Sequence, residues 1–243
     1  MLITGGGRGI GAATAVRAAG RGYDVAVNYV SDRASAERVI SACRAWGVRA
    51  LAIQADVSDE ADVTRMFEHI DTEFGSIDCL VNNAAIVAPM SRVDSLDADR
   101  VRRLFDVNVV GTLLCAREAI RRMSTQHGGR GGVIINVSSA AARHASPGEY
   151  VDYAATKGAV DTITVGLAKE VAAEGIRVNA VRPGIIETDI HRESGMVDRL
   201  EQAAATIPMG RLGTPDEVAG VIVFLAAEAH YMTGAIVDVG GGR

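Results

Sequence analysis

Short apolar runs alternate with longer amphipathic or alanine-rich stretches along this chain. The apolar runs are rich in Val and Ile and mostly continuous, which is typical of strands covered on both faces. They lie at Leu2–Thr4, Asp24–Tyr29, Val48–Gln54, Cys79–Asn82, Gly132–Val137, Arg177–Val181 and Ala235–Val239. Helical patterns occupy about 9–20, 32–46, 59–74, 96–123, 150–174 and 214–228. This alternation predicts an α/β fold, a doubly wound parallel sheet of about seven strands with helices on both faces.

These elements form one predicted domain, residues 1–243, because neither a Pro/Ser/Gly-rich linker nor an internal repeat divides them. The sequence Thr214-Pro215-Asp216-Glu217 indicates a helix start, with Thr as N-cap, Pro at the first helical position and Glu two residues later. The first strand, Leu2–Thr4, is shorter than the roughly 5–6 residues of an average strand. Either the true start of the chain lies upstream or this strand is unusually short. The least regular part, about 184–213, is the predicted place for a mobile lid over the substrate.

Composition narrows the range of partners. The formal charge is −5 without a basic block, which argues against nucleic acid. Cys43, Cys79 and Cys115 are widely spaced without a C-x-x-C pattern, as in reduced cytoplasmic proteins. The histidines lack metal-ligand spacing, no apolar run approaches the ~20 residues of a membrane span, and the N-terminus is too short and glycine-rich for a signal peptide. We therefore expect a cytoplasmic protein without metal, membrane or nucleic acid.

A glycine-rich loop, Thr4-Gly5-Gly6-Gly7-Arg8-Gly9-Ile10-Gly11, follows the first strand and opens the first helix. Glycines let the backbone turn tightly and approach a pyrophosphate, and the helix N-terminus presents N–H groups to it. The spacing is G-x-x-x-G-x-G rather than G-x-G-x-x-G. A glycine-rich stretch alone is a weak signal, and the less favoured alternative is a plain tight turn.

From this loop onward the chain resembles the short-chain dehydrogenase/reductase family along almost its whole length. The matching motifs are Asp56 in Ala55-Asp56-Val57, Asn82-Asn83-Ala84-Ala85 (the family's NNAG with Ala last), Asn108-Val109-Val110-Gly111 and Pro183-Gly184-Ile185-Ile186-Glu187-Thr188. The ending, Pro208–Gly213 through Asp238–Gly241, is similar to the branch of 3-oxoacyl-acyl-carrier-protein reductases and glucose 1-dehydrogenases. The resemblance implies a Rossmann fold, an NAD(P)-dependent oxidoreductase acting on CH–OH groups, and a homotetramer.

The resemblance also implies cofactor contacts from the glycine loop, from later strand ends and from the helix near 150–174. With the residues at the end of the second strand, the expected set is Gly5, Gly7, Arg8, Gly9, Ile10, Gly11, Asn28, Tyr29, Ser31, Arg33, Asp56, Val57, Asn82, Ala84, Tyr153, Lys157, Pro183, Gly184, Ile186 and Thr188. Asp56 would contact the adenine, and Thr188 and the Ile186 backbone would contact the nicotinamide carboxamide.

The second strand ends in neutral Asn28 and Tyr29, not in the acidic residue that favours NAD by binding the adenosine ribose. A 2′-phosphate would meet no anion there, and Ser31, Arg33 and Arg8 could donate to it. We therefore predict NADP(H) over NAD(H). The alternative is that Ser31 caps the next helix and both arginines are solvated, and capping is compatible with phosphate binding.

Tyr153 and Lys157 are four residues apart, so they share one face of a helix, whereas Tyr150 has Ala154 at that spacing. A Tyr hydroxyl has a pKa of about 10, and a nearby ammonium is expected to lower that pKa and make the group an acid/base for a carbonyl oxygen. The resemblance gives Lys157 a second role, hydrogen bonding to both ribose hydroxyls, which suits a compact ammonium better than a planar guanidinium. The alternative is an accidental surface pair.

The serine that assists this tyrosine must be chosen by spacing. The family's serine usually lies 13 positions before the tyrosine, but that position is Ala140; Ser139, at 14, is the better candidate, and Ser138 more plausibly bonds to local backbone. Ser139 would stabilise charge on the substrate oxygen. Asn108 resembles the fourth catalytic family member and would hold a helix backbone and a water linked to Lys157. Alternatively it caps or kinks its helix.

The substrate stays open at this stage. The loop 140–152 and the region 184–213 offer Ala145, Ser146, Pro147, Ile190, His191, Met196, Leu200 and Ile207. A 3-oxoacyl thioester on acidic acyl carrier protein would need a basic docking face, for which Arg121, Arg122 and Arg130 are candidates. A sugar or similar small secondary alcohol fits equally well. The alternative from another class is a catalytically idle NADP(H)-binding sensor.

Overall fold

A computed structural model describes residues 1–188 and 204–243 of the chain. Its centre is one parallel sheet of seven strands in the order β3-β2-β1-β4-β5-β6-β7. The strands are β1 (Leu2–Ile3), β2 (Val25–Tyr29), β3 (Ala50–Gln54), β4 (Cys79–Asn82), β5 (Gly132–Val137), β6 (Ile176–Pro183) and β7 (Ile236–Val239). The predicted fold class is confirmed, and the order reverses between β1 and β4, where open α/β sheets bind ligands.

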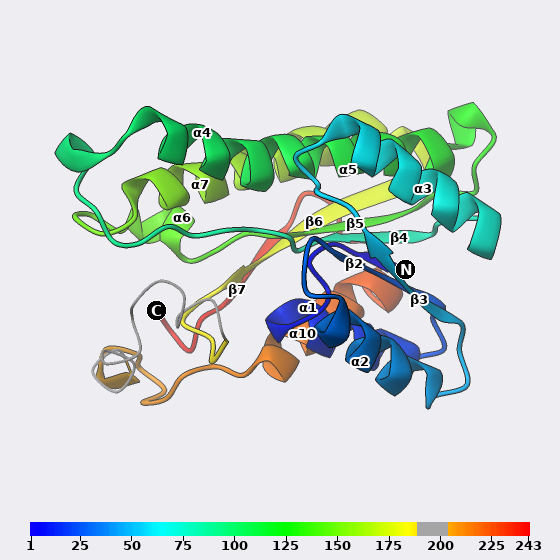
Figure 1. Cartoon of the computed structure of the whole chain (residues 1–243), viewed down its shortest axis with the longest axis horizontal. Helices are drawn as coiled ribbons and strands as arrows, with labels where there is room; N and C mark the ends of the chain where they lie inside the picture. The colour runs from blue at the N-terminus through cyan, green and yellow to red at the C-terminus, as the bar shows by residue number, and fades with distance from the viewer. Residues whose placement is uncertain (189–203) are drawn as a thin grey trace.

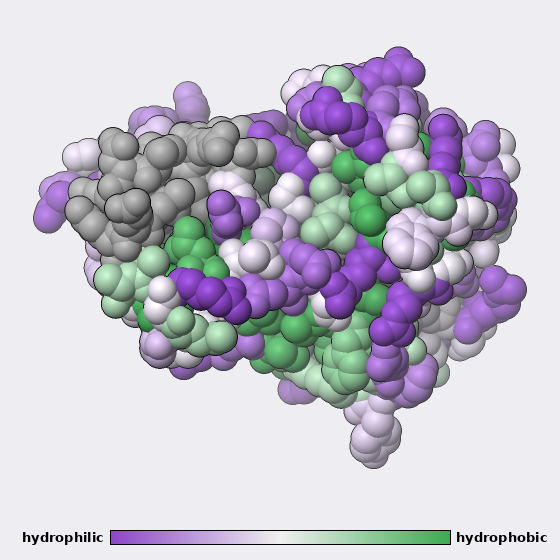
Figure 2. Space-filling view, turned by 90° about the horizontal axis from the view of Figure 1, so that it is seen from below, coloured by the Kyte–Doolittle hydropathy of each residue, from purple (hydrophilic) through white to green (hydrophobic). Residues whose placement is uncertain are grey.

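Helices cover both faces of the sheet (Figure 1). Below it lie α1 (Gly9–Ala19), α2 (Arg33–Arg44) and α10 (Pro215–Ala227). Above it lie α3 (Glu60–Phe74), α4 (Ala98–Phe105), α5 (Gly111–Met123) and α7 (Val151–Val171). A four-residue helix, α6 (Ala141–His144), precedes α7, and short 3₁₀ turns span Val93–Ser95, Thr125–His127 and Ala172–Glu174. Seen from below, the surface mixes apolar patches with polar side chains (Figure 2).

The alternation of side chains along the strands builds a core on each face. Leu2, Leu80 and Ile134 are fully buried in the cluster that includes residues of α3 and α5. Their neighbours Ile3 and Val81 are fully buried in the cluster that includes residues of α1 and α10. Because successive side chains of a strand point to opposite faces, strands with both faces covered must be apolar throughout.

The predicted boundaries lie within about three residues of the observed ones. The helical pattern near 96–123 is α4 and α5 joined by a π-helical turn at Asp106–Val110. The sixth strand continues to Pro183, and β1 consists of only two residues although it is central. The predicted start of α10 is confirmed, because Thr214 and Glu217 form a reciprocal capping box with Pro215 at the first helical position.

Candidate active site

A cavity of about 610 Å³ runs along the edge of the sheet where β1, β2, β4, β5 and β6 end. The predicted site residues that line it are Gly5, Gly7, Arg8, Gly9, Ile10, Asn28, Tyr29, Ser31, Asp56, Val57, Ala84, Ser139, Tyr153, Lys157, Pro183, Gly184, Ile186 and Thr188. Gly11, Arg33, Asn82 and Asn108 do not line it. The fold therefore brings most of the predicted site residues together at this cavity, and the other four lie outside its lining.

The glycine loop is held tightly against the segment after β4. Gly5 has a φ of +60°, and a Cβ there would lie 3.0 Å from the Cα of Ala84. The Thr4 hydroxyl accepts hydrogen bonds from the backbone N–H groups of Asn83 and Ala84, both at 3.0 Å. At Gly11, a Cβ would lie 2.6 Å from the Asn83 amide nitrogen. Gly11 thus permits close packing behind the cavity and does not form its wall.

Two buried amides act as scaffold. Asn28 accepts a hydrogen bond from the Gly5 N–H at 3.2 Å and donates to the Ala55 carbonyl at 2.8 Å, so it fixes the glycine loop to the strand ends. Asn82 donates to the Asn136 side chain at 3.0 Å, well inside the sheet. Asn82, which was predicted to contact the cofactor, therefore does not line the cavity, because its side chain links β4 to β5.

At the end of β2, the helix cap is Asp32 and not Ser31. The Asp32 carboxylate accepts the Ser35 N–H at 2.9 Å and the Ser35 hydroxyl at 2.5 Å. Ser31 and Asp32 both line the cavity. Arg33 lies outside the lining, with a 76% exposed side chain 3.6 Å from Glu37. Its helical position turns it toward solvent.

Asp56 lines the cavity with its carboxylate already engaged. It accepts hydrogen bonds from the N–H and hydroxyl of Ser58, at 2.9 and 2.6 Å, and pairs with Arg103 at 3.1 Å. Burial raises the pKa of Asp56, but the hydrogen bonds from Ser58 and Arg103 outweigh it and leave the pKa below its usual value. Arg103 also lines the cavity. The sequence did not single it out, because its position in the helical pattern is the same as that of an arginine exposed to solvent.

Ser139, Tyr153 and Lys157 meet where β5 ends and α7 begins. The Lys157 ammonium is 5.7 Å from the centre of the Tyr153 ring and donates to the Val137 carbonyl at 2.8 Å. A hydrogen bond from Ser139 reaches the Tyr153 side chain. The Ser138 hydroxyl instead donates to the Lys157 carbonyl at 3.2 Å. The backbone role expected for Ser138 is the one observed.

The electrostatics differ from the sequence expectation. Burial raises the pKa of Tyr153 to about 12, and the hydrogen bond from Ser139 acts in the opposite direction. Burial lowers the pKa of Lys157 to about 8, against the influence of Asp161. Desolvation of the phenol outweighs the lowering of the Tyr153 pKa that is expected from the ammonium, which donates to the Val137 carbonyl.

Asn108 lies in the π-helical turn between α4 and α5 and is 1% exposed. Its side chain accepts the Ile86 N–H at 2.8 Å and donates to the Ile86 carbonyl at 3.0 Å. It also donates to the Thr156 hydroxyl at 3.1 Å, and Thr156 donates to the Tyr153 carbonyl at 2.7 Å. Asn108 thus fastens the segment after β4 to α7 and positions groups that touch the cavity.

The substrate end of the cavity includes residues that the sequence did not single out. His144, Glu149 and Arg243 line it, with Ser146 and Tyr150 from the predicted substrate loop. These residues form no recognisable sequence motif, and they meet only because the fold brings them together. The expected lid residues Ile190, His191, Met196 and Leu200 lie outside the described residues.

Residues 1–188 and 204–243 show neither a metal centre nor a membrane-spanning helix. These residues hold no cluster of His, Cys, Asp and Glu that could bind a metal ion. None of their helices has both the length and the apolar character needed to cross a bilayer.

Known proteins resemble the chain over its full length. A family model described as enoyl-(acyl carrier protein) reductase matches residues 5–243. The uncharacterized oxidoreductase YgfF of Escherichia coli is 49% identical over 100% of this chain and 98% of its own length. A 3-ketoacyl-(acyl-carrier-protein) reductase from Brucella melitensis complexed with NADH has a TM-score of 0.92 at 37% identity, covering 100% of this chain and 96% of that one. A Burkholderia cenocepacia short chain dehydrogenase in complex with NADP has a TM-score of 0.91 at 33% identity, covering 99% and 96%.

The chain therefore belongs to the short-chain dehydrogenase/reductase family. It is an oxidoreductase of that family, in a branch that resembles the 3-oxoacyl-acyl-carrier-protein reductases.

Proposed function

We propose that this protein transfers a hydride between NADP(H) and a carbonyl or secondary alcohol. The observation that carries the proposal is the meeting of Ser139, Tyr153 and Lys157 on one wall of a cavity that also contains the glycine loop. A hydroxyl, a phenol and an ammonium at the end of β5 supply a hydrogen-bond donor, a proton donor and a positive charge for a single oxygen atom.

The cavity fits a nicotinamide dinucleotide. Gly9, with a φ of +54°, and Gly7 line it at the start of α1, where the positive end of an 11-residue helix suits a pyrophosphate. A side chain at Gly9 would lie 3.3 Å from the Thr188 methyl group, which closes the cradle from the other side. When bound, the cofactor supplies or accepts the hydride.

The protein's own groups handle the proton. In reduction, the Tyr153 hydroxyl donates its proton to the carbonyl oxygen while the Ser139 hydroxyl donates a hydrogen bond to the same atom. The phenolate that remains is stabilised by the Lys157 ammonium. In alcohol oxidation the Tyr153 phenolate accepts the proton. Burial raises the pKa of Tyr153 to about 12, so the phenol carries its proton at neutral pH. Efficient proton transfer needs a pKa nearer the working pH, so binding of cofactor and substrate must lower it in this proposal.

Turnover should depend on Tyr153 and not on Tyr150, the matched tyrosine that lines the same cavity. We expect Tyr153→Phe to lower kcat by about 10²–10⁴-fold, the usual contribution of a general acid, with NADPH affinity retained. Tyr150→Phe should remain active. The assay follows reduced-nicotinamide absorbance with a panel of 3-oxoacyl thioesters, ketones and sugars. Equal losses in both variants would refute the assignment, and cofactor binding without turnover on any substrate would favour an idle sensor.

NADP(H) is preferred in this proposal because of the groups at the end of β2. Arg8 and Ser31 line the cavity beside neutral Asn28 and Tyr29. The carboxylate of Asp32, which also lines the cavity, is bound to the N-terminus of α2 through Ser35. Of the two similar structures, one holds NADP and the other holds NADH, so similarity to known proteins does not distinguish the two cofactors. The preference for NADP(H) is supported by the side chains at the end of β2.

Replacing Arg8 should weaken NADPH selectively. We expect Arg8→Ala to lower kcat/KM for NADPH by about 10- to 100-fold, as for loss of a charge-assisted contact, with a much smaller effect for NADH. Arg33→Ala is the matched control, because Arg33 lies outside the cavity lining beside Glu37. Steady-state kinetics with both cofactors measure the ratio. A wild-type preference for NADH, or a larger effect at Arg33, would contradict the proposal.

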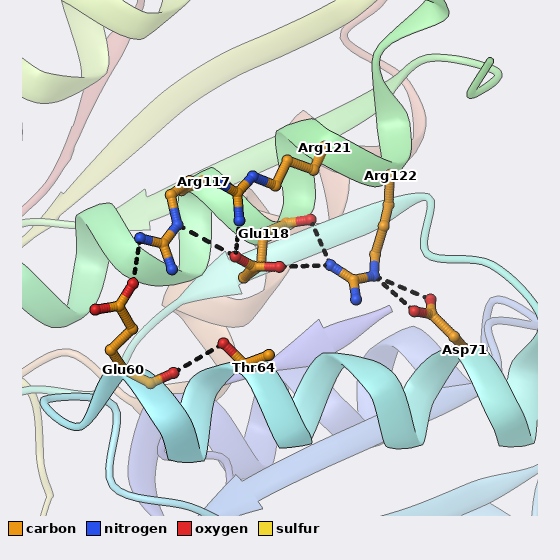
Figure 3. Close-up of polar contacts among 7 residues, drawn as sticks. All are labelled: Glu60, Thr64, Asp71, Arg117, Glu118, Arg121 and Arg122. Carbon is orange, nitrogen blue, oxygen red and sulfur yellow. Dashed lines mark hydrogen bonds and ion pairs between the residues drawn. The ribbon is translucent and has the colours of Figure 1, made fainter. Parts of the chain in front are cut away.

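The carbonyl substrate is a 3-oxoacyl thioester, a sugar or a similar small molecule. The arginines proposed to dock an acidic carrier protein are already used within the chain: Arg121 and Arg122 bind Glu118, each at 2.8 Å (Figure 3), and Arg130 lies 3.4 Å from Asp78. This engagement reduces the basic character of that surface, and a small substrate is thereby somewhat favoured over a carrier-bound one.

We also propose that the enzyme works in the cytoplasm as a homotetramer. Cys43, Cys79 and Cys115 are free and buried, and burial raises the pKa of each thiol, as suits cysteines that serve as core residues. Exposed apolar side chains include Val110 and Leu113 at the start of α5 and Phe224 on α10, on opposite sides of the sheet. Such patches are suited to subunit contacts.

A further inference from the structure

A buried ion pair joins α4 to the first turn of α7. The Nε of Arg100 donates to Asp152 Oδ2 at 2.7 Å, and Nη2 of the same guanidinium donates to Oδ1 at 3.3 Å. The side chain of Asp152 is 2% exposed and that of Arg100 is 14% exposed. The carboxylate is therefore shielded from water, and most of the guanidinium is too.

The pair reaches the backbone on both sides. Asp152 Oδ1 also accepts the N–H of Tyr153 at 2.9 Å. The third nitrogen of Arg100 donates to the Pro89 carbonyl at 2.5 Å, in the segment that follows β4. Nearby, the Ser91 N–H donates to the Glu149 carbonyl at 2.9 Å. One guanidinium and one carboxylate thus connect α4, the segment after β4 and the residue that carries the proposed proton donor.

This location has consequences for the site without forming part of its surface. Within the described part of the chain, neither Arg100 nor Asp152 lines the cavity. The segment they fasten does line it through Ala85, Ile86 and Val87. Asn108 holds the same segment at Ile86, and α4 lies alongside α7 in the layer above the sheet (Figure 1).

We propose that Arg100 and Asp152 are positioning residues that set the orientation of the Tyr153 hydroxyl toward the substrate oxygen; this inference rests on the proposed role of Tyr153. A buried ion pair rarely adds net stability over apolar side chains of similar size, so its fixed fork geometry is the more informative property. Proton transfer needs donor and acceptor within hydrogen-bond reach, and small displacements of a catalytic group are costly.

The test uses Arg100→Met, Asp152→Ala and the double variant in the full-length protein. The double variant leaves no unpaired buried charge, so it remains informative if a single variant folds poorly. We expect kcat to fall by about 10- to 100-fold in each variant, as for a misplaced catalytic group. The kcat of the double variant should be at least as high as that of the less active single variant, because both changes break the same interaction. The NADPH dissociation constant, measured by fluorescence titration, should be unchanged because the glycine loop is untouched.

Conservative variants separate positioning from simple stabilisation. Asp152→Asn keeps an oxygen that can accept the Tyr153 N–H, so its kcat should lie between those of the wild type and Asp152→Ala. Glu118→Gln is the matched control: Glu118 is a carboxylate with 5% side-chain exposure, bound by Arg117, Arg121 and Arg122 (Figure 3), away from the cavity lining. It should lose thermal stability and keep its kcat.

The assays are run well below the melting temperature of each variant, with folding checked by circular dichroism. A folded double variant with wild-type kcat would overturn the inference, as would an equal loss of kcat in Glu118→Gln. If Tyr153→Phe itself retains turnover, the proposed function fails first. If Tyr153→Phe is inactive and the Arg100 and Asp152 variants are not, only the positioning role fails.

Discussion

Lys157 carries its ammonium group in a position that is only 3% exposed. Burial lowers the pKa of this group to about 8, and the carboxylate of Asp161, one helical turn further along α7, raises it. Asp161 is 8% exposed and pairs with Arg182 at 2.9 Å. Arg182 in turn lies 3.7 Å from Asp238. The charge on Lys157 therefore depends on a carboxylate that is not part of the recognised motifs.

The rate of reduction should fall as pH rises through about 8, because the Lys157 ammonium that stabilises the Tyr153 phenolate loses its proton there. Asp161→Asn removes the charge that supports the ammonium, so the Lys157 pKa falls further and the alkaline limb of kcat moves to lower pH. Profiles of kcat between about pH 6 and 10 measure this limb, because that range extends to both sides of the Lys157 pKa of about 8.

Asp216→Asn is the control for this pH prediction. Asp216 forms an exposed ion pair with Arg17, 2.7 Å apart, on the face with α1 and α10. Its loss should leave the limb in place, because exposed charges are screened by solvent. A limb that moves to higher pH in Asp161→Asn, or stays where it is, would show that Asp161 does not support the ammonium.

The residues of the site show what sequence alone supplies. Tyr153 and Lys157 follow from helical spacing, and the structure places them together at the cavity. The expectation for the Tyr153 pKa failed because burial is a property of the whole environment and leaves no mark in a four-residue spacing. The partners Arg100 and Asp152 are 52 positions apart, and no local pattern relates them.

Among the secondary-structure elements, long periodic stretches were predictable and local departures were not. The strands buried on both faces gave continuous apolar runs, and the capping box at Thr214 fixed the start of α10. The π-helical turn at Asp106–Val110 was missed, since it continues the helical pattern on either side. That turn bears Asn108, whose side chain grips the Ile86 backbone. An irregular turn at a functional residue is a recurrent use of π-helical geometry.

The position of Ser139 could be predicted by counting residues back from Tyr153, but the conformation of the loop between them could not. Ser139 to Tyr153 spans one position more than the family's usual spacing, and the structure places the short helix α6 in this interval. Ala145 and Ser146 follow with φ values of +58° and +43°, although neither is glycine. Left-handed backbone at two consecutive L-residues costs energy and is maintained by the surrounding structure, which sequence does not reveal.

At the scale of the molecule, exposed apolar side chains at α5 and on α10 lie on opposite sides of the sheet. Val110, 41% exposed, precedes α5, and Leu113, 42% exposed, lies on this helix in the layer above the sheet. Phe224, 45% exposed, lies on α10 below it, and β7 ends the strand order with a partly exposed edge. An uncovered strand edge invites pairing, and natural proteins commonly cover it. Two separate self-complementary faces generate a closed tetramer with perpendicular two-fold axes.

Size-exclusion chromatography with light scattering should therefore give a mass near four times 25.4 kDa for the wild type. Leu113→Glu and Phe224→Glu each place a charge in one face, so each variant should yield dimers held by the other face, and the double variant should yield monomers. Trp46→Glu is the control, because Trp46 is 61% exposed and follows α2, outside both α5 and α10. A monomeric wild type would refute the assembly, and dissociation by Trp46→Glu instead of the other two would place the contacts elsewhere.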